Sequence, residues 1–75
     1  MERAIAGIWE QVLEMSGIGV RDNFVELGGD SLSAARVSIE IIDRFDVEVP
    51  PDFLFDPGTV AAVAEFVSQA QLVAL

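Results

Sequence analysis

The sequence predicts an all-α fold, a small four-helix bundle of three main helices and one short helix, with a long loop between helices 1 and 2. Three segments carry apolar residues at the spacing of an amphipathic helix, and no strand-like run has a second run to pair with. The chain has 75 residues, and 52% of them are hydrophobic, which suits one domain with a modest core. We therefore expect a single domain over residues 1–75, in which the tail at 68–75 frays.

The first helix is expected over residues 2–15. Its apolar residues follow the i, i+3, i+4, i+7, i+8 spacing of one buried face. Ser16 and Gly17 should end it, because glycine commonly terminates helices. The predicted buried face consists of Ile5, Ile8, Trp9, Val12 and Leu13.

Residues 16–30 are expected to form the long loop. Phe24 and Leu27 are large apolar residues in an otherwise polar stretch, so we expect them to insert into the core and hold the loop on the bundle. A connection of this length in so small a domain is often functional.

The second helix is expected from Ser31 or Leu32 to Phe45. Its polar residues occupy a narrow arc and its apolar residues fill most of the rest, which is typical of a central helix with neighbours on several sides. We expect part of the apolar arc, near Leu32 and Val37, to remain exposed for partners.

The last third of the chain contains one short helix and one long helix. Residues 47–51 should be extended because the residue before a proline avoids the helical region. A short helical turn is expected at 52–56, and Thr59 is expected to cap the last helix. The buried face predicted for that helix consists of Val60, Val63, Ala64 and Val67, widened by Phe66.

The composition excludes several classes of function. The chain has no cysteine, histidine or lysine, so it lacks thiolate ligands, the commonest metal ligand and the commonest general base. Its net charge of -9 should repel nucleic acid and anionic membranes and favour partners with basic surfaces. With no signal peptide and no apolar run of membrane-spanning length, we expect a cytoplasmic monomer.

The stretch "LGGDSL" places Ser31 directly after two glycines and an aspartate, where the second helix begins. G-D-S-L also opens the sequence of a family of esterases, but those enzymes need a downstream histidine and a larger α/β scaffold. Asp22, Glu26 and Asp30 recur every four residues but lack the dense pattern of a calcium loop. We therefore predict no catalytic residue and no dedicated metal site.

Two interpretations of the serine then remain. In the structural one, Asp30 or Ser31 caps the second helix and Gly28 and Gly29 supply the preceding turn. In the functional one, the glycines leave the hydroxyl accessible to another enzyme, and the helix N-terminus favours a phosphate ester on it. The second interpretation predicts a serine that another enzyme modifies with a phosphate-containing group.

Three segments of the chain resemble carrier proteins of the thiolation type, which are the peptidyl carrier domains of nonribosomal peptide synthetases. Acyl carrier proteins of fatty acid and polyketide synthesis are close relatives and remain the alternative, although the paired glycines favour the peptidyl type. One departure from the family pattern is Gly58, which separates Pro57 from the capping Thr59. The similar segments are "DNFVELGGDSL" (22–32), "RFDVEVP" (44–50) and "FLFDPGTVAAVAEFV" (53–67), with Arg36 between the first two.

The resemblance implies that Ser31 carries 4'-phosphopantetheine, transferred from coenzyme A by a phosphopantetheinyl transferase, with Gly29, Asp30 and Leu32 flanking the attachment site. The arm's thiol would hold an aminoacyl, peptidyl or acyl group for an adenylation or acyl-loading enzyme and for condensation, tailoring or thioesterase enzymes. The chain itself would catalyse nothing. A rival interpretation is a non-carrier acidic helical module that binds a basic partner. By position, the docking candidates are Ser33, Arg36, Val37, Phe53 and Leu54.

Several of these residues could instead have a purely structural role. Phe53 and Leu54 could simply fill the core, and Arg36 could be a solvated surface charge. Asp30 could take part in docking the transferase or only cap the helix.

Overall fold

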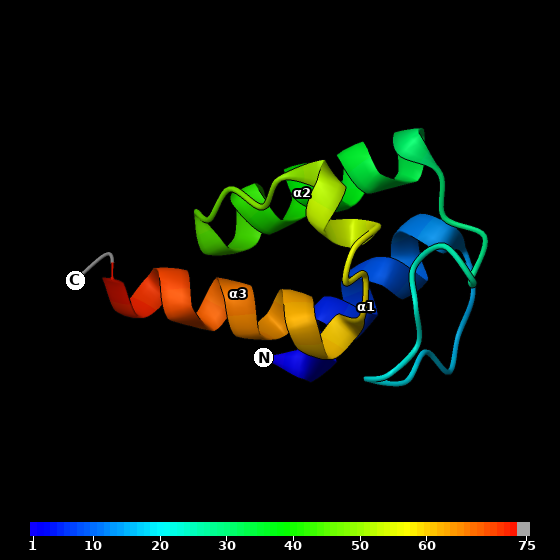
Figure 1. Ribbon diagram of the computed structural model, residues 1–75, viewed down its shortest axis with the longest axis horizontal. Coiled ribbons are helices and arrows are strands. Elements are labelled where there is room, and N and C mark those ends of the chain that lie inside the picture. Colours follow the sequence, from blue (N-terminus) through cyan, green and yellow to red (C-terminus); the bar gives the residue numbers. More distant parts are fainter. Residues whose placement is uncertain (74–75) are drawn as a thin grey trace.

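The computed structural model describes residues 1–73, and within them the fold is all-α, as the sequence predicts. The elements are α1 (Glu2–Leu13), α2 (Ser31–Phe45), the short 3-10 helix η1 (Pro51–Leu54) and α3 (Val60–Val73) (Figure 1). Helix α1 packs against both α2 and α3, and η1 packs against α2. None of the helices in the described part of the chain is both long and apolar enough to cross a bilayer.

Helix α1 supplies the largest side chain of the core. Ile5, Ile8 and Trp9 are fully buried, as predicted, while the next turn is only partly buried. The helix ends at Leu13, earlier than expected, because Glu14 takes a left-handed conformation with φ 56° and ends the hydrogen-bonded ladder.

Helix α2 has the predicted bounds but not all of the predicted burial. Its core face is the stripe Ala34, Val37 and Ile41, all fully buried, so the expectation that Val37 is exposed is wrong. Leu32 and Ile39 lie instead on the opposite side of the helix, and Ile42 lies on the flank of the helix; Ile39 and Ile42 border the 48–51 segment. Leu32 is 64% exposed, Ile39 63% and Ile42 43%.

The segment after α2 is held against that helix by a buried hydrogen bond. The Ser38 hydroxyl donates to the backbone carbonyl of Val49 over 3.0 Å. Beyond it, η1 occupies 51–54 rather than the expected 52–56. It begins at Pro51 because proline is suited to the first position of a helical turn, and it buries Leu54.

Helix α3 begins as predicted, since the Thr59 hydroxyl accepts the Ala62 amide hydrogen over 3.2 Å. The helix continues to Val73, so 68–73 of the tail expected to fray is helical, and residues 74 and 75 lie outside the described residues. The predicted core residues Val60, Val63, Ala64 and Val67 are buried.

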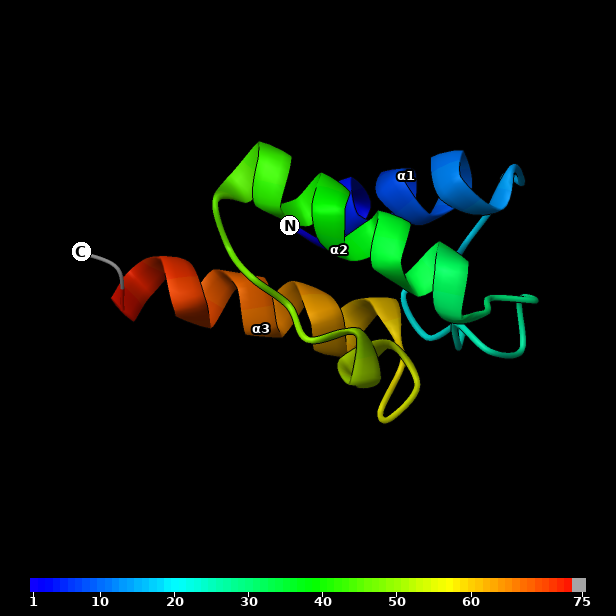
Figure 2. The ribbon, with the colours of Figure 1, turned by 90° about the horizontal axis from the view of Figure 1, so that it is seen from above.

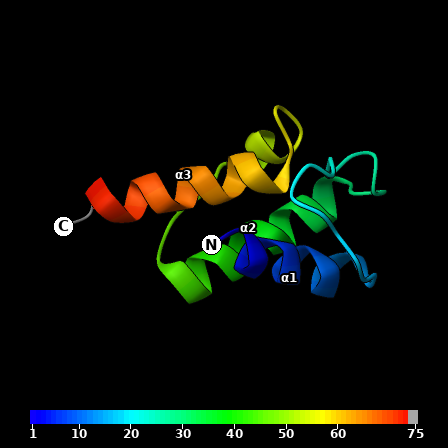
Figure 3. The same ribbon diagram turned by 90° about the horizontal axis from the view of Figure 1, so that it is seen from below.

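Residues 20–24 of the 16–30 loop lie against the start of α3 (Figure 3). The Phe24 amide donates to the Gly58 carbonyl over 2.8 Å, and the Ala61 amide donates to the Val20 carbonyl over 2.9 Å. Phe24 is fully buried and its ring meets Trp9 edge-on, with ring centroids 5.1 Å apart. The predicted role of Phe24 is thereby confirmed, and Leu27 is partly buried against the same core.

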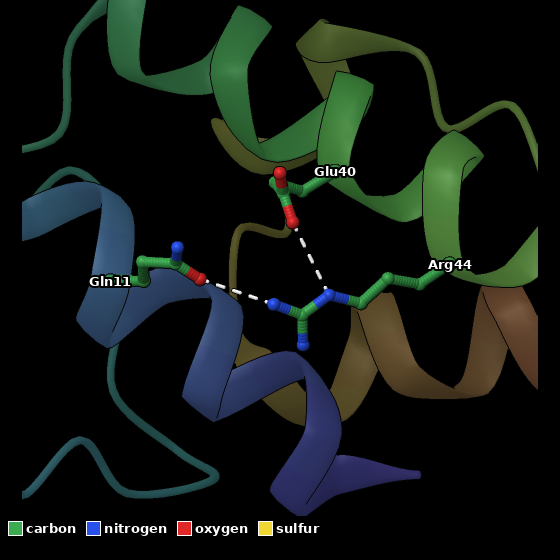
Figure 4. Close-up of polar contacts among 3 residues, drawn as sticks. All are labelled: Gln11, Glu40 and Arg44. Atoms are coloured by element: carbon green, nitrogen blue, oxygen red, sulfur yellow. Dashed lines mark hydrogen bonds and ion pairs between the residues drawn. The ribbon is translucent and has the colours of Figure 1, made fainter.

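A surface network joins α1 to α2 (Figure 4). The Arg44 guanidinium donates to a Glu40 carboxylate oxygen over 3.2 Å and to the Gln11 side-chain oxygen over 3.1 Å. Because these groups are solvated, the ion pair contributes about 0.3–0.5 kcal/mol at most. The network therefore orients the two helices but is a minor source of stability.

We predict that Ser38→Ala lowers the free energy of unfolding by about 1–2 kcal/mol, because it leaves the Val49 carbonyl without its buried donor. Urea denaturation measures the change. Ser68→Ala, in the middle of α3, is the helical serine control and should stay within about 0.5 kcal/mol of the wild type. Equal stability of Ser38→Ala and the wild type would contradict this role.

Candidate functional site

Ser31 is the first residue of α2 and is exposed. Figure 2 shows that this end of α2 lies at one end of the molecule, away from the C-terminal end of α3. The 28–30 segment approaches it along the surface, and Gly28 turns the chain with φ 95°. The serine hydroxyl is therefore reachable from outside.

Asp30, and not Ser31, is the N-cap of α2. One Asp30 carboxylate oxygen accepts the Ser33 amide hydrogen over 2.9 Å, and the Asp30 carbonyl accepts the Ala34 amide hydrogen over 2.9 Å. The backbone amide of Ser33, followed by its hydroxyl, lowers the pKa of Asp30 below the ordinary 3.8, with desolvation opposing. Since Asp30 performs the capping, the Ser31 hydroxyl is left free for another role.

The two glycines before Asp30 are needed for different reasons. Gly28 has a positive φ, and a Cβ there would meet open space. Gly29 does not have a positive φ, but a Cβ placed on it would lie 2.3 Å from the Phe24 ring. Sequence reasoning attributed both glycines to the turn before α2 or to exposure of the serine, and it missed the close packing at Gly29.

Nothing in the chain activates the Ser31 hydroxyl as a nucleophile. The chain has no histidine, and the neighbouring Asp30 is a weak base because its pKa is lowered and its carboxylate is engaged in the cap. Within residues 1–73, no cluster of three or more acidic residues is arranged to hold a metal ion. Activation must therefore come from a partner.

The surroundings of Ser31 fit a phosphate ester. The hydroxyl lies on the first turn of a fifteen-residue helix, where amide hydrogens and the helix dipole favour an anion. Gly29 has no side chain to obstruct a bulky substituent, and Leu32 turns outward beside the hydroxyl. The Asp30 charge opposes an anion, but the Ser33 amide partly compensates it.

The structure separates the docking candidates into two groups. Leu32 and Arg36 are exposed, and Ser33 is partly so. Val37 and Leu54 are fully buried in the core, so neither presents its side chain to a partner, which corrects both assignments. Phe53 is partly buried and packs on Phe66, with ring centroids 4.9 Å apart.

Ile39 is exposed on the same side of α2 as Leu32, and Ile42 is exposed on the flank of the helix; sequence reasoning counted both in the apolar arc and named neither as exposed. The helical wheel already indicates that Ile39 is exposed. Ile39 lies close to Leu32 in angle and far from the Val37 and Ile41 stripe, so the two groups could not both face a single core.

We predict that Asp30→Asn reduces the acid sensitivity of the fold. The folded-state pKa of Asp30 is depressed, so its carboxylate stabilises the fold above the ordinary pKa of 3.8 and this contribution is lost as the pH falls through the folded pKa. Thermal unfolding should show the variant below the wild type at neutral pH, with the two converging in acid. Parallel stability curves over the whole range would contradict the capping role.

Comparison with known proteins places these features in a family. Residues 3–67 match the family model described as "Phosphopantetheine attachment site". Gramicidin S synthase 2 of Aneurinibacillus migulanus is 42% identical over 71 residues, which are 95% of this chain but 2% of the synthase. The chain thus spans a very small part of the length of that relative.

Solved structures give the same result. A chain in the structure of the phosphopantetheine transferase Sfp in complex with coenzyme A and a peptidyl carrier protein superposes with a TM-score of 0.88 at 41% identity, covering 91% of this chain and 88% of that one. The structure of McyG A-PCP complexed with phenylalanyl-adenylate gives a TM-score of 0.80 at 39% identity, covering 88% of this chain and 10% of that one. With a family match over residues 3–67 and relatives of the same fold, the chain belongs to the phosphopantetheine attachment site family.

Proposed function

We propose that the chain is a peptidyl carrier domain, extending over residues 1–75, that carries aminoacyl, peptidyl or acyl groups as thioesters on a 4'-phosphopantetheine arm at Ser31. One observation carries the proposal. Asp30 caps α2 in place of Ser31, so an exposed hydroxyl stands at the helix N-terminus with no structural task. Family membership supplies the identity of the group that this hydroxyl takes.

Attachment is a phosphoryl transfer in which Ser31 is the acceptor. The Ser31 oxygen forms a bond to the pantetheine-bearing phosphorus of coenzyme A, the pyrophosphate P–O bond breaks, and the nucleotide half leaves with the bridging oxygen. The hydroxyl proton passes to a base of the transferase, because this chain offers none beside Ser31. The attached arm supplies the thiol that a chain without cysteine lacks.

The chain itself presents the Ser31 hydroxyl and binds the partner enzymes. Gly28 and Gly29 leave the hydroxyl accessible, and the first turn of α2 favours the negative phosphate. The net charge of -9 favours enzymes with basic docking surfaces and disfavours nucleic acid and anionic membranes. Leu32, Ser33, Arg36 and Phe53 remain the docking candidates with accessible side chains.

The partners follow from this role. They are a phosphopantetheinyl transferase, an adenylation or acyl-loading enzyme, and condensation, tailoring or thioesterase enzymes of a nonribosomal peptide pathway in the cytoplasm. The solved relatives that hold a transferase or an adenylation domain together with a carrier support the first two. We propose that the domain acts as a monomer.

An acyl carrier protein of polyketide or fatty acid synthesis is the second candidate, since its arm and fold would be the same. The Gly28–Gly29 pair favours the peptidyl type. Loading assays separate the two, because an adenylation enzyme charges the first with an amino acid and an acyltransferase charges the second.

We predict that incubation with coenzyme A and a broad-specificity phosphopantetheinyl transferase adds the mass of one arm to the wild type and none to Ser31→Ala. Intact-mass spectrometry measures the gain. Ser33→Ala, which removes the nearest other hydroxyl of α2, is the matched control and should be modified. An unmodified wild type, or equal modification of Ser31→Ala, would refute the attachment site and favour a non-carrier module.

We also predict that Leu32→Ala raises the KM of the transferase for this domain by about fivefold, because it removes an exposed apolar contact beside the hydroxyl. Its stability should stay within about 0.5 kcal/mol of the wild type. The matched control is Leu72→Ala, which changes an equally exposed leucine on α3. An unchanged KM for Leu32→Ala would remove Leu32 from the docking surface.

A further inference from the structure

Phe24 connects the loop, the core and the segment that leads to Ser31. Its backbone amide donates to the Gly58 carbonyl, and its carbonyl accepts the Gly29 amide hydrogen over 2.9 Å. Its ring packs edge-on against Trp9 and, on another side, against Phe55, with centroids 6.2 Å apart in the second pair. The side chain is fully buried, so it has very little freedom to move.

The same ring also determines how closely the backbone of Gly29 can approach the core. A Cβ on Gly29 would lie 2.3 Å from Cε2 and 2.4 Å from Cδ2 of Phe24, closer than real Cβ atoms approach other atoms. The φ angle of Gly29 is not in the left-handed region, so the backbone alone would accept alanine. The absence of a side chain at Gly29 is therefore required by the Phe24 ring.

The segment from Gly29 to Ser31 is thus restrained from both sides. Before it, the Phe24 ring and carbonyl hold Gly29; after it, the Asp30 cap fixes the first turn of α2. Phosphoryl transfer depends on placing the attacking oxygen in line with the phosphorus, and a displacement of about 1 Å lowers the rate substantially.

We propose that Phe24 is a positioning residue, whose ring seated on Gly29 sets where the Ser31 hydroxyl meets the coenzyme A held by the transferase. The proposal rests on the function proposed above. It is separate from docking, because Phe24 is buried and touches no partner. Its loss should lower kcat, whereas loss of an exposed docking residue raises KM.

The test uses Gly29→Ala, Phe24→Val and the double variant Phe24→Val/Gly29→Ala. Valine lacks all three ring atoms that approach Gly29, Cδ2, Cε2 and Cζ, so the double variant relieves the overlap. Gly7→Ala is the control for a glycine-to-alanine change, because a Cβ on Gly7 meets nothing within 4 Å. The readouts are transferase kcat and KM, and the amide NMR shifts of Ser31 and Leu32 in the unmodified protein, with Trp9 fluorescence as the check of folding.

We expect Gly29→Ala to lower kcat by about 10- to 100-fold with little change in KM, and the double variant to be faster than Gly29→Ala. The amide shifts of Ser31 and Leu32 should move in Gly29→Ala and return toward those of Phe24→Val in the double variant. Gly7→Ala should match the wild type.

The proposal is overturned if folded Gly29→Ala reacts at the wild-type kcat, or if the double variant is no faster than Gly29→Ala. Should Gly29→Ala not fold, a double variant that folds supports the contact and one that does not fold refutes it. An unmodified wild type would refute the carrier function instead. The amide shifts would then still decide whether Phe24 sets the position of Ser31.

Discussion

The edge-on contact between Trp9 and Phe24 attaches the 16–30 loop to the bundle, and the proposed positioning of Ser31 depends on that attachment. A buried aromatic side chain contributes about 4–6 kcal/mol from the roughly 150–250 Å² that it removes from water. The Trp9 indole nitrogen, which has no hydrogen-bond partner within residues 1–73, costs about 1–3 kcal/mol. The free energy gained by burying the aromatic rings outweighs the cost of the unpaired indole nitrogen. The packing of Phe24 on Trp9 therefore holds the long loop in a chain that has no disulfide.

Residues between Phe24 and Ser31 are restrained one after another. Phe24 holds Gly29 by a backbone hydrogen bond and by its ring, and Asp30 then caps α2 through the Ser33 amide. Asp30 thereby performs the capping that Ser31 could otherwise have performed. The hydroxyl is consequently held in a defined place while remaining chemically uncommitted, which is the combination that a substrate for another enzyme requires.

Much of this arrangement could be predicted from local patterns. The bounds of α2, the Thr59 cap, the buried Phe24 and the position of Ser31 follow from spacing and residue type, which act within a few residues. Val37 and Leu54 could not be assigned in the same way, because an apolar side chain is buried or exposed according to which elements pack around it. The left-handed Glu14 and the contact between Phe24 and Gly29 likewise depend on tertiary packing.

Helix α2 also carries apolar side chains that are exposed rather than buried in the core. Leu32 and Ile39 lie opposite the core stripe and Ile42 lies on its flank, on the helix that begins at Ser31. The net charge of -9 opposes association between copies of the domain, which offsets the effect of these exposed apolar side chains. A carrier must bind several enzymes in turn and release each of them, which favours a small apolar contact beside the arm over a large interface. On the proposed function, the same helix divides the two tasks: its buried stripe anchors it to the core, and its exposed residues are the ones that partners would contact.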